Sequence, residues 1–200
     1  MSEEKRRIIE EARAARIAAL GEWLNARLAP PAAPFRVLEI GCGHGHFLSA
    51  YAAAHPEHFC LGVDLLSKRI RRAIRKRDNA HLANLEFLKA DAGELLEAWT
   101  PAFPLSAIFI LHPDPWPKTR HHKNRLIQPA FLDILAGLST TGATRLHFRT
   151  DHDAYFDWAR EHVAAHPAWE ILDGAPWPFE QETVFSQRLP HHQDLIAVRH

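Results

Sequence analysis

The stretch Phe35-Arg-Val-Leu-Glu-Ile-Gly-Cys-Gly-His-Gly45 decides the fold of this chain. Its first six residues are mostly apolar and typical of a short buried strand, and glycines follow at positions 41, 43 and 45. Glycine adopts positive φ without strain and allows a ligand to approach the backbone closely. Residues 46–54 favour a helix. The stretch therefore predicts a strand, a tight glycine turn and the start of a helix.

The same alternation of strand and helix continues along the chain. We expect further strands over residues 59–63, 85–88, 106–111, 144–148, 169–172 and 194–198, and helices over residues 66–77, 92–98, 126–138 and 152–165. This pattern predicts an α/β fold of the Rossmann-like type, with a mostly parallel seven-stranded sheet and helices on both faces. In such sheets the ligand binds beyond the carboxyl ends of the strands.

An amphipathic helix over residues 3–28 precedes the alternation and ends before a proline-rich linker. We therefore divide the chain into residues 1–34, the helix with its linker, and residues 35–200, the α/β domain. The formal net charge is zero, so nucleic-acid binding would depend on local basic patches. The sequence shows no signal-peptide or membrane-span pattern, and its two cysteines have no metal-ligand or disulfide spacing. We expect a cytoplasmic protein without membrane contact.

Acidic residues stand at three successive strand ends: Glu39 before the glycines, Asp64 and Asp91. The glycine spacing GxGxG differs from the GxGxxG of dinucleotide sites, which argues against NAD. Asp64 can accept the hydroxyl protons of a ribose, and Asp91 can accept from an adenine amino group. The alternatives are simple tight packing for the glycines and helix N-caps for Asp64 and Asp91. The combination of these acids with Gly41 and Gly43 resembles the pattern of the class I S-adenosylmethionine-dependent methyltransferases. This resemblance implies S-adenosylmethionine as the cofactor.

The fourth expected strand runs into the segment HPDPWPKTRHHKNR, residues 112–125. Its three prolines fix φ and remove backbone donors, so we expect a stiff, non-helical segment. That stiffness would hold Asp114 and Trp116 at the sheet edge, where a planar base can lie near the aromatic ring and donate to the carboxylate. The alternative is that the prolines and Trp116 cap the core while Asp114 binds turn amides.

Basic side chains complete this segment and form a compact candidate for binding phosphates: Lys118, Arg120, His121, His122, Lys123 and Arg125. A metal site built from His112, His121 and His122 is the alternative, but no carboxylate or helical ligand spacing supports it, so we expect no metal. A second basic surface lies on the helix over residues 66–77, where Lys68, Arg72, Arg75 and Lys76 share one face. Such faces are usually only solvated.

The string Pro113-Asp-Pro-Trp-Pro-Lys-Thr-Arg-His-His-Lys-Asn-Arg125 resembles the signature of the bacterial tRNA (guanine-N7)-methyltransferases, and the resemblance extends from about Val37 to His152. It implies tRNA as the partner and cofactor contacts by Glu39, Asp64, Asp91 and Asp114. It also implies substrate contacts by Lys118, Asp151, Thr183 and the loop Arg120, His121, His122, Lys123, Asn124 and Arg125. The family's C-terminal motif is Thr-x-aromatic-Glu, whereas this chain has Thr183-Val-Phe-Ser186. Asp64 also stands where the family more often has Glu.

The resemblance implies transfer of a methyl group from S-adenosylmethionine to N7 of a guanine in tRNA. Because N7 carries a lone pair, the reaction needs no covalent nucleophile and depends on positioning. We expect Asp114 to be the catalytic residue, since a carboxylate stabilises the positive charge that moves onto the purine. The alternatives are a methyltransferase acting on a different RNA or on an exocyclic amino group, and an RNA-binding protein that keeps the fold without catalysis. We favour a monomer.

Overall fold

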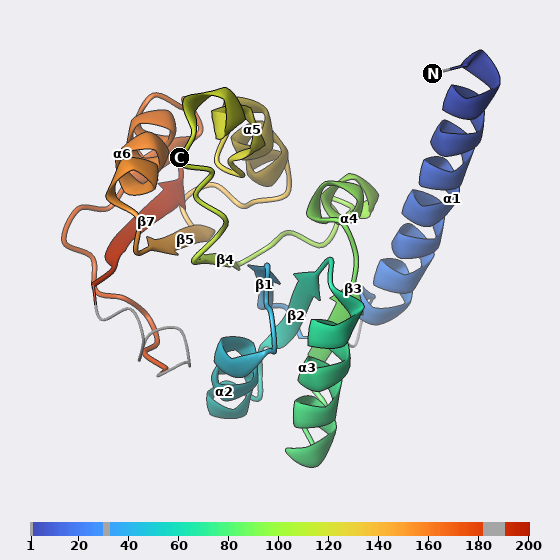
Figure 1. The fold of residues 1–200 in the computed structure, drawn as a ribbon. Coiled ribbons are helices and arrows are strands. Elements are labelled where there is room, and N and C mark those ends of the chain that lie inside the picture. The colour runs from blue at the N-terminus through green and yellow to red at the C-terminus, as the bar shows by residue number, and fades with distance from the viewer. Residues whose placement is uncertain (1, 30–32, 182–190) are drawn as a thin grey trace.

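The computed structural model describes residues 2–29, 33–181 and 191–200. These residues form one seven-stranded sheet in the order β3-β2-β1-β4-β5-β7-β6 (Figure 1). The strands are β1 Arg36–Ile40, β2 Phe59–Asp64, β3 Leu85–Lys89, β4 Ala107–Leu111, β5 Arg145–Thr150, β6 Trp169–Ile171 and β7 Gln193–Arg199. The neighbours among β1 to β5 pair in parallel, whereas β7 runs antiparallel to β5 and β6. The predicted α/β class and the seven-stranded, mostly parallel sheet are confirmed.

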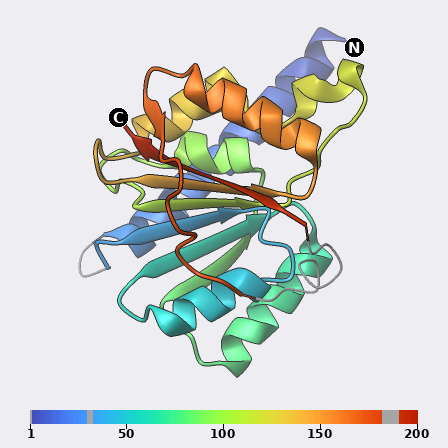
Figure 2. The ribbon, with the colours of Figure 1, turned by 90° about the vertical axis from the view of Figure 1, so that its left-hand side faces the viewer.

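Helices cover both faces of this sheet (Figure 2). One face carries α1 Glu3–Leu28, α4 Ala92–Ala98, α5 Pro129–Gly137 and α6 Asp153–Ala164, and the other carries α2 His46–Ala54 and α3 Ser67–Asn79. Each face buries its own apolar core, the first including Leu38, Leu132 and Tyr155 and the second including Phe47 and Phe109. Strand side chains alternate between the two cores because successive residues of a strand point to opposite faces.

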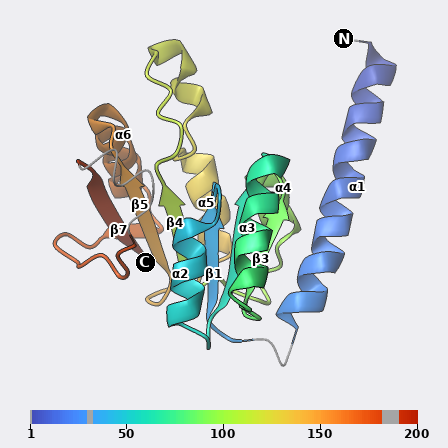
Figure 3. The same ribbon diagram turned by 60° about the horizontal axis from the view of Figure 1, so that its bottom comes forward.

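The helix α1 packs onto the domain through its last turns, where Leu24 and Leu28 are buried in the same core as the sheet. An ion pair between Arg16 and Glu94 ties its middle to α4, while its first turns extend away from the sheet (Figure 3). At its start, the Ser2 hydroxyl accepts a hydrogen bond from the N–H of Lys5. Within the described parts of the chain, no helix is long and apolar enough to cross a membrane.

The helix α5 begins at Pro129, so the expected start at Leu126 is wrong. Proline suits the first helical position because its missing N–H has no partner there in any helix. Just upstream, the N–H groups of Leu126 and Ile127 donate to the hydroxyl of Tyr155 on α6. These two bonds hold the chain just after the 112–125 segment against α6.

The segment between β6 and the last described residues before position 182 crosses the α2 side of the sheet (Figure 2). Trp177 and Phe179 pack there against the second core. The Phe179 ring meets Phe47 at 5.9 Å and Tyr51 at 5.4 Å between ring centroids, both edge to face. Trp177 packs edge to face on Phe109 of β4 and His147 of β5, whereas Phe179 packs on α2.

Candidate active site at the carboxyl edge of the sheet

The glycine loop after β1 has the backbone that its composition predicts. Gly41, Gly43 and Gly45 have φ values of +78°, +55° and +67°. A side chain on Gly45 would place its Cβ 2.5 Å from the ring of Phe87 on β3, so any other residue here would force the ring to move and would be strained at this φ. The N–H groups of Gly41 and Cys42 both donate to the carbonyl of Val63 at the end of β2. The loop is thus anchored to the neighbouring strand while its exposed side stays open to a ligand.

Asp64 joins this loop to the start of α3. Its carboxylate, 7% exposed, accepts hydrogen bonds from the N–H of Gly43 at 3.2 Å and the N–H of Leu66 at 2.7 Å, and Arg69 lies 3.4 Å away. The residue therefore shapes the loop, which sequence reasoning did not foresee. A carboxylate oxygen accepts more than one hydrogen bond, so ribose hydroxyls can still bind to it.

Glu39 lies beneath the glycine loop with only 3% of its surface exposed. Burial raises the pKa of its carboxyl to about 8, a backbone hydrogen bond from Leu48 acts in the opposite direction, Asp64 adds to the rise and Lys76 opposes it. Its Oε2 atom is buried and has no hydrogen-bond partner among the described residues. A buried acceptor without a donor is costly, and a ligand ammonium would supply the missing donor and positive charge. The residues here fit the cofactor expected from the sequence.

Asp91 follows β3 and is exposed. Its Oδ1 accepts a hydrogen bond from the N–H of Glu94 at 3.1 Å, so it is the N-cap of α4. The N-cap alternative is thus the observed conformation. The bond uses one of the two carboxylate oxygens, and the proposed contact with an adenine amino group requires only the other.

The segment after β4 is irregular and strained on both sides of Asp114. His112 and Trp116 have φ values of +48° and +44°, a conformation that residues other than glycine rarely adopt. Such strain persists only where the surroundings impose it, and it concentrates at functional sites. Here the N–H of His112 donates to the carbonyl of Arg149 at 2.8 Å, while Trp116 meets the ring of His121 edge to face. Asp114 is held between these two residues with its carboxylate exposed.

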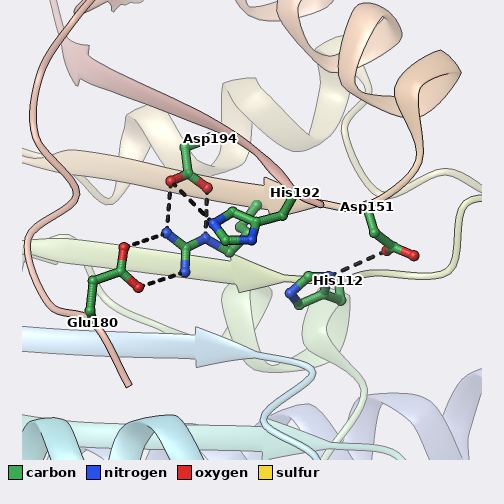
Figure 4. Close-up of polar contacts among 6 residues, drawn as sticks. His112, Asp151, Glu180, His192 and Asp194 are labelled. Atoms are coloured by element: carbon green, nitrogen blue, oxygen red, sulfur yellow. Dashed lines mark hydrogen bonds and ion pairs between the residues drawn. The ribbon is translucent and has the colours of Figure 1, made fainter. Parts of the chain in front are cut away.

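Asp151 follows β5 and faces the same segment. Its Oδ1 lies 3.3 Å from Nδ1 of His112, a contact that links the β4 and β5 loops (Figure 4). Burial lowers the pKa of His112, and Asp151 partly offsets this effect. The sheet order places β4 between β1 and β5, so the glycine loop, Asp114 and Asp151 follow three adjacent strands. This is the topological switch point at which open α/β sheets bind their ligands.

Most of the predicted phosphate-binding side chains lie in or beside a short 3₁₀-helix, Thr119–Asn124. Lys118, Arg120, Lys123 and Asn124 are exposed, and His121 and His122 are half-buried. The turn therefore presents a group of exposed cations, as expected, and it begins after the stretch of three prolines that was predicted to be non-helical.

Arg125 is different, and its expected role as a phosphate contact is wrong. Its side chain is buried, with 3% of the residue exposed. The guanidinium donates to the carbonyls of Pro115 at 2.9 Å and Ala154 at 3.1 Å, and it lies over the rings of Tyr155 and Trp158. The guanidinium of Arg125 donates to backbone carbonyls of the protein itself, so this side chain holds the rigid segment against α6.

Sequence reasoning missed a second buried cation, Arg149 on β5. Its guanidinium pairs with Asp194 at 2.6 and 2.7 Å and with Glu180 at 2.9 and 3.0 Å, and both carboxylates are labelled in Figure 4. The guanidinium also stacks on the ring of Trp177. Burial by itself would lower the pKa of Arg149, but the hydrogen bonds to Asp194 and Glu180 raise it above its ordinary value. The prediction ended this strand at residue 148, one position before Arg149, whereas β5 runs to Thr150 and buries the charge, which therefore needs a partner.

The predicted substrate residue Thr183, with Ser186, lies outside the described residues. The structure does not bring His112, His121 and His122 together as ligands within the described ranges. The described metal candidate is instead His55, Glu57 and His58, between α2 and β2 at the opposite edge of the sheet. Its two imidazole rings are parallel to within 7°, so their in-plane lone pairs do not point at one ion in this arrangement.

Comparisons with known proteins identify the family to which this chain is similar. A family model described as "Putative methyltransferase" matches residues 34–191. The tRNA (guanine-N(7)-)-methyltransferase of Halorhodospira halophila is 40% identical over 162 residues, which span 78% of this chain and 69% of that protein. The enzyme of the same name from Caulobacter vibrioides is 34% identical over 168 residues, 78% of this chain and 74% of that protein.

A solved structure shares the fold at lower identity. The 16S rRNA (adenine(1408)-N(1))-methyltransferase of Catenulisporales acidiphilia, solved with its cosubstrate SAM, is 19% identical with a TM-score of 0.56, over 90% of this chain and 91% of that chain. The matched residues 34–191 contain the glycine loop, the strand-end acids and the strained segment around Asp114. Because the family model spans most of the chain and the two relatives are 40% and 34% identical over 69% and 74% of their lengths, the chain belongs to the tRNA (guanine-N7)-methyltransferase family.

Proposed function

We propose that this chain transfers the methyl group of S-adenosylmethionine to N7 of a guanine in tRNA, with Asp114 as the catalytic carboxylate. The observation that carries the assignment is the placement of Asp114. Its exposed side chain is held between two residues in strained conformations, at the switch point next to the glycine loop. Strain of about 1–3 kcal/mol per residue is a cost that a purely connecting loop would not require.

The residues around the glycine loop would hold the cofactor. Gly41 and Gly43 allow it to approach the backbone, and Glu39 would accept the ammonium group on its unpaired Oε2. Asp64 would accept the ribose hydroxyls, and Asp91 would accept from the adenine amino group. When bound, S-adenosylmethionine supplies an electrophilic methyl group on a sulfonium.

The protein's own contribution to the transfer would be positioning and electrostatics. The guanine N7 lone pair attacks without prior deprotonation, so no general base is required at that atom. Positive charge then moves onto the purine ring, and the carboxylate of Asp114 would stabilise it. Asp151, joined to the same loop through His112, would accept from the N–H edge of the base. Lys118, Arg120 and Lys123 would hold backbone phosphates. We further propose that the chain acts as a monomer in the cytoplasm, with tRNA as its partner.

Removing the Asp114 carboxylate tests this assignment. In Asp114→Ala, methyl incorporation into tRNA should fall at least about 100-fold, while S-adenosylmethionine affinity stays within about tenfold, because the lost interaction belongs to the transition state. Asp157→Ala, which removes an exposed acid on α6, is the matched control and should keep full activity. Full activity in Asp114→Ala would exclude this role. Mapping the modified nucleotide by reduction and strand cleavage at N7-methylguanine tests the site of methylation.

A further inference from the structure

Arg149 binds two carboxylates with one buried guanidinium. Its side chain is 8% exposed and donates four hydrogen bonds, two to Asp194 and two to Glu180. One carboxylate is enough to neutralise a guanidinium, so burial of this charge requires only one of the two partners. The second carboxylate is therefore not needed to bury the charge, and its role lies in what it connects.

The two carboxylates belong to parts of the chain that are held in different ways. In Figure 4, Asp194 lies on a strand and Glu180 on a stretch without regular structure. Asp194 stands directly opposite Arg149 in the antiparallel ladder of β5 and β7, so the sheet itself fixes this pair. Glu180 belongs to the irregular segment 172–181, and its side chain is 66% exposed. The pairing with Glu180 thus fastens this segment to the end of β5.

Aromatic packing holds the same segment against the neighbouring strands. Trp177 lies edge to face on Phe109 of β4 and on His147 of β5, and the Arg149 guanidinium lies 4.2 Å from the centroid of the Trp177 ring. Among the described residues, residues 176–180 form no backbone–backbone hydrogen bond. Side-chain contacts therefore hold this part of the segment, and Arg149 takes part in two of them.

The end of β5 also supports the strained segment around Asp114. The carbonyl of Arg149 accepts a hydrogen bond from the N–H of His112 at 2.8 Å, and Asp151 lies 3.3 Å from the ring of the same histidine. The ladder between β5 and β7 ends one residue after Arg149, at Thr150, and strand ends fray unless they are fastened. His112 is strained at a φ of +48°, so it relaxes when its support loosens.

We propose that Arg149 is a positioning residue for the methyl transfer. Its guanidinium, paired with Glu180 and Asp194, keeps the end of β5 in place. Its carbonyl then keeps His112 in the strained conformation next to Asp114. The proposal rests on the proposed function, since the reaction that Arg149 serves is the proposed methylation.

Two variants break the pairing with Glu180 and keep the buried charge neutralised. Glu180→Ala removes an exposed side chain while Asp194 remains on Arg149, so the protein should fold. Arg149→Lys keeps the charge but lacks the planar fork that binds carboxylates in pairs of hydrogen bonds. The matched control is Asp173→Ala, which breaks another bidentate pair of the same segment, with Arg160 on α6.

Amide exchange at His112 measures the support directly and does not depend on activity. In Glu180→Ala and in Arg149→Lys, the N–H of His112 should exchange at least about tenfold faster than in the wild type, because its acceptor is held less firmly. Exchange at Leu38, in the middle of β1, should not change, and neither should exchange at His112 in Asp173→Ala. Unchanged exchange at His112 in the first two variants overturns the proposal, and so does equal acceleration in Asp173→Ala.

Steady-state kinetics test whether this support matters for the reaction. Glu180→Ala should lower kcat for tRNA methylation at least about tenfold and leave the Kd for S-adenosylmethionine and the KM for tRNA within about twofold, because only the alignment in the transition state is lost. Glu180→Gln, which keeps one acceptor oxygen, should recover part of this loss. In an Asp114→Asn background, Glu180→Ala should lower the remaining kcat less than about twofold, since both residues act through one carboxylate.

The outcomes separate this proposal from the proposed function. Faster exchange at His112 with a normal kcat overturns the positioning role and leaves the proposed function standing. An equal loss of kcat with and without the Asp114 carboxylate also overturns that role, because Glu180 then acts elsewhere. If exchange accelerates but the wild type does not methylate tRNA, the link between Arg149 and His112 stands, while the proposed function and the positioning role that rests on it both fail.

Discussion

Glu39 allows a quantitative prediction about stability and pH. Its ordinary pKa is 4.5, and burial raises the value to about 8 in the folded protein. Between these values the folded state retains a proton that the unfolded state has released. The contribution of Glu39 to stability is therefore fully present below about pH 4.5, falls as pH rises and stops falling above about pH 8. The variant Glu39→Gln has no proton to lose at this position, so it lacks this part of the pH dependence.

The two pKa values determine the size of the effect. At about pH 5, Glu39→Gln should exceed the wild type in free energy of unfolding by about 1 kcal/mol, and at about pH 7.5 by about 4 kcal/mol. The gain of about 3 kcal/mol across this range is an upper value, because water that enters the site reduces the penalty for burying a charge. Urea unfolding of both proteins at half-unit pH steps measures it. A difference that stays constant from pH 5 to pH 8 would refute the reasoning.

Cofactor binding should change in the opposite direction. The ionised carboxylate is the form that pairs with the ammonium group of S-adenosylmethionine, so wild-type affinity should increase as pH rises toward about 8. Glu39→Gln should bind the cofactor more weakly at about pH 8 and show no such increase. Isothermal titration at the same pH values checks this. Equal cofactor affinity in the two proteins at every pH would remove Glu39 from the cofactor site.

Three further predictions concern stability and RNA binding. Arg125→Met leaves two backbone carbonyls without their donor, so unfolding should become easier by about 2–5 kcal/mol in urea, while the salt slope of tRNA binding stays at the wild-type value. Lys118→Ala and Lys123→Ala should each leave stability within about 0.5 kcal/mol and lower that slope by about 0.9, as measured by filter binding over a salt series. Gly45→Ala places a methyl group against Phe87 at positive φ, so thermal unfolding should show a loss of about 2–4 kcal/mol. A stable Arg125→Met with a reduced slope would restore that residue to the RNA-binding group.

Local patterns were sufficient for the strand–helix alternation and for the acids at the strand ends. The strand predicted over residues 35–40 is β1 Arg36–Ile40, and the helix predicted over residues 3–28 is α1 Glu3–Leu28. The positive φ values of Gly41 and Gly43 also follow from residue type. These features depend on apolar periodicity and on the conformational range of single residues, both of which are short-range properties. The resemblance to a known family then supplied the chemistry.

The strain next to Asp114 was only partly predictable. Three prolines indicated a rigid segment, but the left-handed conformations occur at His112 and Trp116. The positions of the prolines do not predict them. They arise because the segment is fastened at both ends, through the bond from His112 to Arg149 and through the Arg125 guanidinium on Pro115. Strain of this kind depends on constraints from distant parts of the chain, so it is visible only once these parts have come together.

The sequence by itself determined the fold class, the glycine loop and which residue types stand at the carboxyl edge of the sheet. Tertiary structure decided which of several similar cations stays exposed and which is internal: Arg125 donates to a carbonyl 29 positions away, and Arg149 pairs with carboxylates 31 and 45 positions away. The physical reason is that burial and pairing of a charge depend on the order of the strands, which brings distant residues together. Periodicity reports only which face a residue occupies.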